Sequence, residues 1–239
     1  MSENFPLVSV ITVCKNSVDT LERCLLSVQQ QQYPNIEHII LDGGSTDGSL
    51  AILDKHSNKI AFWKSEPDNG IYDAMNKAIQ FAKGDWILFL GADDFLYPGF
   101  SDFCLRLKVN RRLYYGCSLW ENIVQGGMYR KYDLAKKNIC HQAIFYPKHI
   151  FEKYKYNTKY KVRADYVLNM QCWAEKDFDA EYIPILVSNY TPGGFSGKVN
   201  DEEFEKDKLT LTGKYLGYWP MFRYMIRRYK NKRKNIENE

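Results

Sequence analysis

The sequence predicts an α/β fold in which a mixed, mostly parallel sheet is flanked by helices. Short apolar runs alternate with helical patterns through the first hundred residues, and strands that alternate with helices usually pair in parallel. The runs are apolar at consecutive positions, as in LVSVITVC at residues 7–14 and WILFL at residues 86–90, which is typical of strands buried on both faces. Such a sheet needs helices on both of its sides.

The elements of the first half follow from hydrophobic periodicity. Apolar runs bounded by turn residues predict strands, and apolar residues at three- and four-residue spacing predict helices. The predicted strands are residues 7–14, 36–41, 60–64 and 86–90, and the predicted helices are residues 20–31, 50–56 and 71–83. Asp19 and Glu22 predict a capping box at the start of the first helix, and Gly84 predicts a C-cap at the end of the third.

The second half has a looser pattern. Its predicted strands are residues 113–120, 128–132 and 182–190, and its predicted helices are residues 147–154 and 164–175. The turn-rich segment TPGGFSG follows, where Gly193 and Gly194 predict either an ordinary surface turn or a loop that closes over a ligand. Because the chain is long enough for one core, we interpret residues 1–212 as one domain and residues 213–239 as a basic C-terminal extension.

Composition is that of an ordinary globular protein. Hydrophobic residues make up 45% and charged residues 26%, which argues against disorder and against a membrane span. Residues 1–6 include an acid and no base, so no signal peptide is predicted and a cytoplasmic location is expected. The six cysteines show no CxxC spacing, which favours reduced, packed thiols over a zinc site or disulfides.

Polar residues gather where the predicted strands end. The carboxyl ends of parallel strands form one edge of the sheet, where ligands bind. Lys15 and Asn16 follow the first strand, and the acidic residues of this rim are Asp42, Glu66, Asp68, Asp93 and Asp94. Carboxylates so close together repel one another unless a cation or hydrogen-bond donors lie among them.

The adjacent acids Asp93 and Asp94 suggest a metal site. Mg²⁺ and Mn²⁺ are hard cations that prefer carboxylate and phosphate oxygens. Taken alone, the dipeptide fits the start of a turn or a helix cap better than it fits a metal site. Its context therefore decides the interpretation.

That context is a set of four motifs. In this order and spacing, VSVITVCKN, LDGGSTDGS, EPDNGIYDAMNKAI and GDWILFLGADD together resemble the nucleotide-sugar-dependent glycosyltransferases of family 2. The resemblance is close over about residues 6–100 and looser to about residue 200. It implies a Rossmann-like GT-A fold with a donor half at residues 1–100 and an acceptor half at residues 101–212.

The resemblance implies roles for individual residues. Asp42 matches the family's contact to the donor nucleobase, Asp93 is expected near the donor ribose, and Asp94 is expected on the Mn²⁺ or Mg²⁺ ion that grips the diphosphate. The other residues implied in donor binding are Val13, Asn16, Asp68, Gly70, Asn76, Lys77 and His141. For His141 a purely structural role is an equal alternative.

Asp165, in the segment Arg163–Tyr166, matches the acid that takes the proton from the acceptor hydroxyl in this family. A plain helix N-cap is the alternative. The resemblance implies an inverting displacement, in which an α-linked UDP-sugar would give a β-linked product. The implied acceptor is a glycan or a lipid-linked oligosaccharide of cell-surface polysaccharide biosynthesis.

The basic character of the chain, whose formal net charge is +4, is concentrated between Arg223 and Lys234, a stretch without acids. Helical spacing places one set of apolar residues opposite its arginines: Leu216, Trp219, Phe222, Ile226 and Tyr229. Such a helix lies readily on an anionic membrane, so peripheral attachment to the inner face of the plasma membrane is expected. The alternatives are a helix packed on the core and a nucleic-acid patch, and the acidic rim argues against a nucleic-acid partner.

Two other functions are considered. A nucleotidyltransferase would need a Gly-rich, basic loop after the first strand, and KNSVDT lacks it. A non-catalytic scaffold that binds a nucleotide-sugar or a glycan is the other alternative. The presence of Asp93, Asp94 and Asp165 together argues against it.

Overall fold

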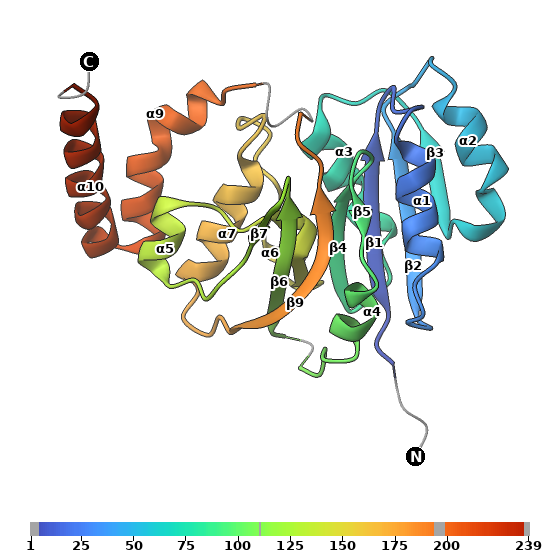
Figure 1. The fold of residues 1–239 in the computed structure, drawn as a ribbon, viewed down its shortest axis with the longest axis horizontal. Helices are drawn as coiled ribbons and strands as arrows, with labels where there is room; N and C mark the ends of the chain where they lie inside the picture. Colours follow the sequence, from blue (N-terminus) through green and yellow to red (C-terminus); the bar gives the residue numbers. More distant parts are fainter. Residues whose placement is uncertain (1–4, 110, 194–198, 237–239) are drawn as a thin grey trace.

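The computed structural model describes residues 5–109, 111–193 and 199–236 and has the predicted α/β architecture (Figure 1). The strands are β1 (Val8–Cys14), β2 (Ile36–Asp42), β3 (Phe62–Ser65), β4 (Trp86–Gly91), β5 (Phe95–Leu96), β6 (Leu113–Trp120), β7 (Ile123–Gln125), β8 (Ile144–Pro147) and β9 (Ala180–Tyr190). The α-helices are α1 (Leu21–Gln29), α2 (Ser49–Lys55), α3 (Ile71–Ala78), α4 (Gly99–Cys104), α5 (Lys131–Lys136), α6 (Ile150–Lys153), α7 (Ala164–Ala174), α9 (Glu202–Leu211) and α10 (Tyr218–Ile236). The short turns are η1 (Ser57–Lys59), η2 (Ile79–Phe81), η3 (His141–Ala143) and the π-helical η4 (Thr212–Leu216).

The sheet has a parallel half and a mixed half. Its strand order is β3-β2-β1-β4-β8-β6-β9-β5, with β7 beside β6. β1 pairs in parallel with both β2 and β4, and β2 pairs in parallel with β3. β8 runs antiparallel to β4 and β6 and so joins the two halves, while β6 and β9 are again parallel. The carboxyl ends of the first four strands therefore share one edge.

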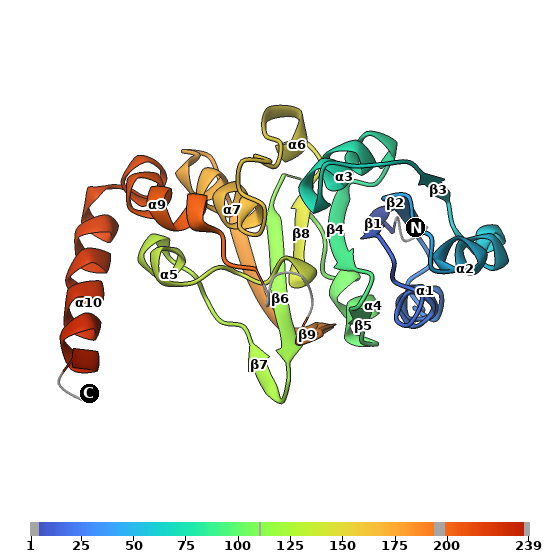
Figure 2. The same ribbon diagram turned by 90° about the horizontal axis from the view of Figure 1, so that it is seen from above.

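Alternate residues of β4 face opposite sides of the sheet. Ile87 and Phe89 pack on the side of α3 and α7, whereas Trp86, Leu88 and Leu90 pack on the side of α1 and α4. Figure 2 shows α3 on one side of this layer and α1 and α4 on the other. All five side chains are at most 1% exposed, which explains the continuous apolar run of this strand.

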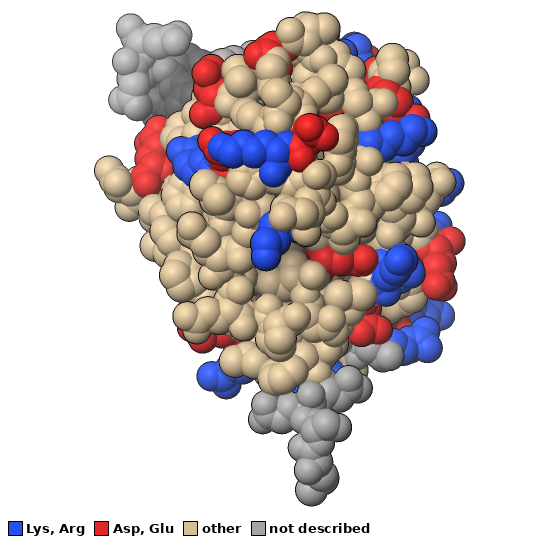
Figure 3. Space-filling view, turned by 90° about the vertical axis from the view of Figure 1, so that its right-hand side faces the viewer, with Lys and Arg blue, Asp and Glu red and all other residues tan. Residues whose placement is uncertain are grey.

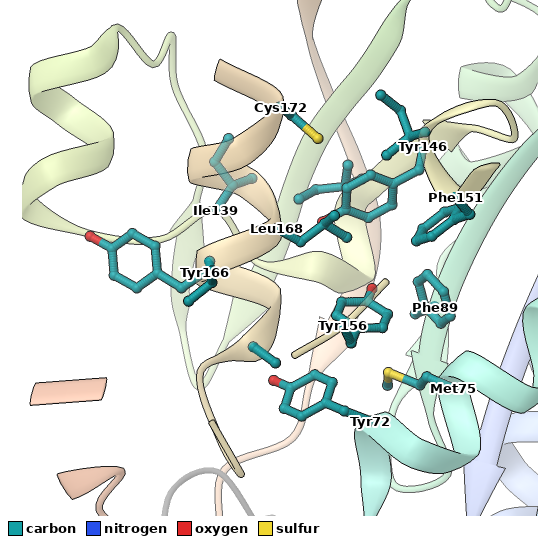
Figure 4. Close-up of a cluster of buried hydrophobic side chains, with 14 of the residues drawn as sticks. Tyr72, Met75, Phe89, Ile139, Tyr146, Phe151, Tyr156, Tyr166, Leu168 and Cys172 are labelled. Atoms are coloured by element: carbon teal, nitrogen blue, oxygen red, sulfur yellow. The ribbon is translucent and has the colours of Figure 1, made fainter. Parts of the chain in front are cut away.

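An aromatic cluster joins the two halves (Figure 4). Tyr72 of α3 lies 5.0 Å from the Tyr156 ring, measured between ring centroids, and Phe89 lies 5.3 Å from it. Tyr146 of β8 packs edge-on against Phe89, and Leu168 of α7 belongs to the same cluster. Large rings bury much apolar area, so this cluster holds α3 and α7 together on one side of the sheet.

Some predicted elements are wrong. Residues 128–132 do not form a strand, because Asp133 Oδ2 accepts from the Arg130 backbone N–H at 3.1 Å and starts helix α5. The helix predicted at residues 147–154 shortens to α6, since Pro147 ends strand β8 instead. The strand β8 itself was not predicted.

Two predicted helix caps are also wrong. Thr20 is the N-cap of α1 without a side-chain bond, and Glu22 instead pairs with Lys55 at 2.7 Å. α3 ends at Ala78, well before Gly84. Position 84 needs a glycine for another reason: a Cβ atom there would lie 2.6 Å from the Ser9 backbone nitrogen.

The edge of the sheet formed by β3 carries charges of both signs. Figure 3 views this edge and shows Lys or Arg side chains interspersed with Asp or Glu. Lys64 of β3 pairs with Glu66 at 2.5 Å, and Lys55 of α2 pairs with Glu22. A charged edge strand discourages pairing with another sheet.

The predicted amphipathic helix α10 lies at the opposite end of the molecule, against α5 and η4 (Figure 1). Arg223 lies over the Tyr132 ring at 3.9 Å, and Tyr224 packs against the core. Leu216, which was predicted to share the apolar face of this helix, lies in η4 before α10 and is buried in the core, and Gly217 in a left-handed conformation separates it from α10. The domain boundary at residue 212 stays a prediction. Among the described helices, none has the length and hydropathy needed to cross a bilayer.

Candidate active site

A cavity of about 1010 Å³ opens at the carboxyl edge of β1 and β4. Its walls come from both halves of the sheet and from the segment before α7. The predicted site residues that line it are Val13, Asn16, Asp68, Gly70, Asp93, Asp94, His141 and Asp165. Residues from distant parts of the sequence thus meet at the edge where parallel sheets bind ligands.

Asp42 does not line this cavity. It is 1% exposed, and its carboxylate accepts hydrogen bonds from the Ser45 backbone N–H at 2.8 Å and from Ser65 Oγ at 2.6 Å. Burial raises the pKa of Asp42, but the hydrogen bonds from Ser45 and Ser65 outweigh burial and leave the pKa below its ordinary value. The structure therefore places Asp42 as the support of the GGST loop.

Asn76 and Lys77 do not line the cavity either. Asn76 Nδ2 donates to the Tyr156 carbonyl at 2.8 Å, and its Oδ1 accepts from the Tyr156 backbone N–H at 2.9 Å. Lys77 pairs with Asp73 at 3.0 Å along the same helix. Both side chains therefore have partners outside the cavity. The hydrogen bonds of Asn76 join α3 to the segment before α7.

Asp68 lies beside the loop that follows β2. A Cβ atom at Gly43 would lie 2.3 Å from Asp68 Oδ2 and 3.3 Å from Lys15 Cδ. The carboxylate of Asp68 therefore fills the space that a side chain at position 43 would need. Asp68, Lys15 and Asn16 together border this end of the cavity.

The carboxylates of Asp93 and Asp94 approach the same backbone position. A Cβ at Gly91 would lie 2.6 Å from Asp94 Oδ2 and 2.8 Å from Asp93 Oδ1, which explains the glycine. Asp94 is 1% exposed and accepts from Gln142 Nε2 at 2.7 Å and from the Thr191 backbone N–H at 2.8 Å. Burial and, next, the charge of Asp93 raise the pKa of Asp94 to about 6.

This acid pair fits a hard divalent cation that arrives with a phosphate ligand. Over the described ranges, no lysine or arginine forms an ion pair with either carboxylate, and Arg23 donates to the backbone carbonyl oxygen of Asp93, at 2.6 Å, and not to its carboxylate. Over the same ranges, no three His, Cys, Asp or Glu side chains gather to hold a metal by themselves. Mg²⁺ is commonly held by one or two carboxylates with water and substrate phosphates, which is the ligand set that this pair would provide.

Asp165 lies in the first turn of α7 and is 7% exposed. The N-cap alternative is wrong, since Arg163 occupies the N-cap position. The Asp165 carboxylate accepts from Asn138 Nδ2 at 2.8 Å, and it lies 3.1 Å from Tyr72 Oη and 3.2 Å from His141 Nδ1. Its carboxylate is thus held in a defined orientation at the cavity wall.

Several residues of the site were not predicted from the sequence. Two of these residues could have been suspected from the sequence: Gln142 because it is next to His141, and Tyr72 because it lies within the GIYDAMN motif. Asn138 and Thr191 had no local signal, because their partners are distant in sequence. Three basic residues also line the cavity and would favour an anionic ligand: Lys15, Lys161 and Arg163.

The predicted turn-rich loop begins beside the acid pair. Thr191 Oγ1 donates to the Asp93 carbonyl at 2.6 Å, and Gly193 lines the cavity in a left-handed conformation. The rest of the predicted loop, including Gly194, lies outside the described residues. The six cysteines are described, and their thiols are free and, except for the half-buried Cys140, buried.

The parallel half-sheet with an acid-lined cavity at its carboxyl edge defines an α/β enzyme of the GT-A type. A family model described as Glycosyl transferase family 2 matches residues 9–170. The chain belongs to this family, and it is a transferase enzyme.

Relatives support this assignment. The chain is 35% identical over 215 residues to the PGL/p-HBAD biosynthesis glycosyltransferase of Mycobacterium bovis (strain BCG / Pasteur 1173P2), covering 84% of this chain and 83% of that one. It is 36% identical over 103 residues to the chondroitin synthase of Pasteurella multocida (strain Pm70), covering 42% of this chain and 11% of that one.

Solved structures share the fold. S. aureus TarS 1–349 in complex with UDP-GlcNAc matches with a TM-score of 0.71 at 16% identity, covering 87% of this chain and 66% of that one. The mannosyltransferase PcManGT from Pyrobaculum calidifontis, in complex with GDP-Man and Mn²⁺, matches with a TM-score of 0.63 at 16% identity. That match covers 94% of this chain and 65% of the mannosyltransferase. The chain thus spans about two thirds of each.

Proposed function

We propose that this protein is an inverting, metal-dependent glycosyltransferase that moves a sugar from a nucleotide diphosphate donor, a UDP-sugar, to a hydroxyl group of a glycan. The observation that carries the proposal is one cavity lined by the acid pair Asp93 and Asp94 and by Asp165. The donor class is supported by the UDP-GlcNAc and GDP-Man in the titles of the two solved structures.

The donor half would hold the nucleotide and the diphosphate. Asp93 would lie near the ribose, and Asp94 would hold a Mn²⁺ or Mg²⁺ ion, which would stabilise the charge of the leaving diphosphate. Val13, Asn16, Asp68 and Gly70 line the same cavity. Asp68 borders the loop after β2, so we assign the nucleobase contact to Asp68 in place of Asp42.

The acceptor side would activate the hydroxyl. As the acceptor oxygen attacks the anomeric carbon, Asp165 takes its proton, and the bond between that carbon and the phosphate oxygen breaks. Attack from the face opposite the leaving group inverts the anomeric centre, so an α-linked donor gives a β-linked product. Tyr72, Asn138 and His141 keep the Asp165 carboxylate directed at the cavity.

The test combines binding and turnover. Asp165→Asn is expected to lower kcat by about 10²- to 10⁴-fold, because a general base is lost, while UDP binding with Mn²⁺ is retained. Asp94→Asn is expected to weaken the Mn²⁺-dependent binding of UDP, measured by calorimetry. Asp102→Asn, on an exposed position of α4 outside the cavity, is the matched control.

Two results would contradict the proposal. Turnover that survives Asp165→Asn would remove the assigned base. Metal-dependent nucleotide binding by a wild-type protein that turns over none of the common nucleotide-sugars would favour the non-catalytic scaffold.

We also propose that α10 attaches the enzyme to an anionic membrane, so that its acceptor is a lipid-linked oligosaccharide of cell-surface polysaccharide biosynthesis. One face of α10 packs on α5 and η4, and the other exposes apolar side chains: Tyr218, Trp219, Phe222, Met225, Ile226 and Tyr229. The exposed Arg223, Arg227 and Arg228 belong to the same helix. An exposed aromatic face with flanking positive charge suits the interface of an anionic bilayer.

A further inference from the structure

We infer that Asn138 and Asn169 are positioning residues for Asp165, aligned by a buried chain of hydrogen bonds that begins at Tyr146. The inference rests on the proposed role of Asp165 as the base. The chain begins at Tyr146 in the aromatic cluster that joins the two half-sheets, which Figure 4 shows, and it ends at Asp165 in the wall of the cavity.

Each link is short. Tyr146 Oη donates to Asn169 Oδ1 at 2.7 Å, and Asn169 Nδ2 donates to Asn138 Oδ1 at 2.8 Å. Asn138 Nδ2 then donates to Asp165 Oδ2 at 2.8 Å. Every donor in the chain therefore points toward the carboxylate.

The direction of the chain follows from its two ends. Burial raises the pKa of Tyr146 well above its ordinary value, so its hydroxyl stays protonated and is able to donate. At the other end, an ionised carboxylate only accepts. Between these ends, turning either amide around would set two donors or two acceptors against each other, so both orientations are determined. Aligned hydrogen bonds also polarise one another and strengthen the last link.

Packing alone does not explain why a polar residue, Asn169, occupies a buried position in α7. It is 0% exposed, it lies in the interior of α7, and it does not line the cavity. A buried amide without hydrogen bonds would destabilise the fold, whereas an apolar residue of similar size would suit the surrounding core. The chain to Asn138 gives this amide both of its partners.

Asn138 is held from two sides. It lies in the segment between α5 and η3, where its carbonyl oxygen accepts from Tyr129 Oη at 3.1 Å and its side chain bridges Asn169 and Asp165. The chain thus ties three elements, β8, α7 and this segment, to one carboxylate oxygen. A displacement of the catalytic base by about 1 Å can slow the reaction on the order of 10²-fold. The position of the Asp165 carboxylate therefore matters for turnover.

Two variants test the inference. Asn138→Ala removes the last donor and is expected to lower kcat by about 10- to 100-fold with less than about a twofold change in the donor KM. Tyr146→Phe removes only the distal hydroxyl and is expected to lower kcat by about two- to fivefold. Gln171→Ala is the matched control, because its amide lies on the same helix and faces Tyr215, outside the chain. Thermal melting and UDP binding of each variant separate these effects from misfolding.

The pH profile separates positioning from a structural role. Without the Asn138 donor the charged form of the base is less stabilised, so the acidic limb of the kcat profile should move to higher pH. Other titratable or charged groups around Asp165, in chain order, are Tyr72 of α3, Cys140 and His141 at the start of η3, Tyr146 of β8, Tyr156 and Arg163 before α7, and Tyr166 within it. Asn138→Ala leaves these groups in place, so the shift reports the lost donor.

The outcomes are distinguishable from a failure of the proposed function. If Asp165→Asn abolishes turnover while Asn138→Ala and Tyr146→Phe both keep kcat within twofold of wild type, the positioning role is wrong and the base stands. If Asp165→Asn retains turnover, the assignment of the base is wrong. In a protein that already carries Asp165→Asn, the further change Asn138→Ala should leave kcat unchanged. If Asn138→Ala lowers kcat there by the same factor as in wild type, Asn138 does not act through Asp165.

Discussion

His38 of β2 is a titratable residue enclosed by the core. It is 4% exposed, and its Nε2 lies 3.0 Å from Thr12 Oγ1 on the neighbouring β1. Its Nδ1 has no hydrogen-bond partner within the part of the chain that the structure describes. Burial lowers the pKa of His38 to about 3, so the ring is neutral in the folded protein.

This burial makes stability depend on pH. In the unfolded chain the ring binds a proton below about pH 6.5, whereas the folded protein does not bind it until about pH 3. The unfolded state therefore binds more protons in this window, and the free energy of unfolding falls as the pH falls. Between pH 7 and pH 5 wild type is expected to lose about 2 kcal/mol more than His38→Gln, measured by urea unfolding. Equal losses in the two proteins would contradict this account.

At the scale of elements, the parallel half was predictable from the sequence because each strand is buried on both faces and reads as one apolar run. β1, β2 and β4 begin and end within a residue or two of the predicted ranges. β8 was not predicted because it is a short apolar run, IFY, that ends in Pro147. Periodicity alone does not distinguish so short a run from the start of a helix. The site was predictable only where a local motif carried it, as at Asp93 and Asp94, whereas the bond from Asn138 to Asp165 depends on tertiary packing.

Asn76 shows how an element is tied to a distant segment. Its two hydrogen bonds to the Tyr156 backbone connect α3, from the first half, to the segment before α7. They also support the end of the aromatic cluster in which Tyr72 and Tyr156 pack.

Asn76→Ala is therefore expected to reduce the free energy of unfolding by about 1–3 kcal/mol, because backbone groups of Tyr156 lose their partners. Urea unfolding measures the change, with Asn58→Ala on exposed η1 as the control. UDP binding should be retained. A variant that loses UDP binding at unchanged stability would instead restore Asn76 to the donor pocket, as the family resemblance implied.

At the scale of the whole molecule, α10 is in contact with the helices of the second half. The Lys208 ammonium group of α9 lies 5.3 Å from the Tyr166 ring of α7 and 4.9 Å from the Tyr224 ring of α10. These contacts join three helices, with Asp165 next to Tyr166 on the first of them. A membrane that holds α10 would thus hold the same unit that carries the proposed base.

Membrane attachment has a direct measurement. The full-length protein is expected to sediment with vesicles that contain phosphatidylglycerol, less so as salt is raised, and to leave neutral vesicles largely unbound. Replacing Trp219 and Phe222 with serine should weaken binding by about tenfold or more, since their exposed rings supply apolar contact. Leu105→Ser, an exposed apolar residue next to α4, is the control. Undiminished binding of the double variant would contradict a membrane role for this face.

The close approach of Asp68 to Gly43 has a consequence for redesign of the enzyme. A side chain at position 43 would occupy the place that the Asp68 carboxylate now holds, so Asp68 would have to turn away to make room for it. The loop after β2 and the loop that carries Asp68 therefore compete to supply an acid at this end of the cavity. Anyone who tries to alter donor preference should treat the two positions as one site and exchange them as a pair, with Gly43→Asp made together with Asp68→Gly.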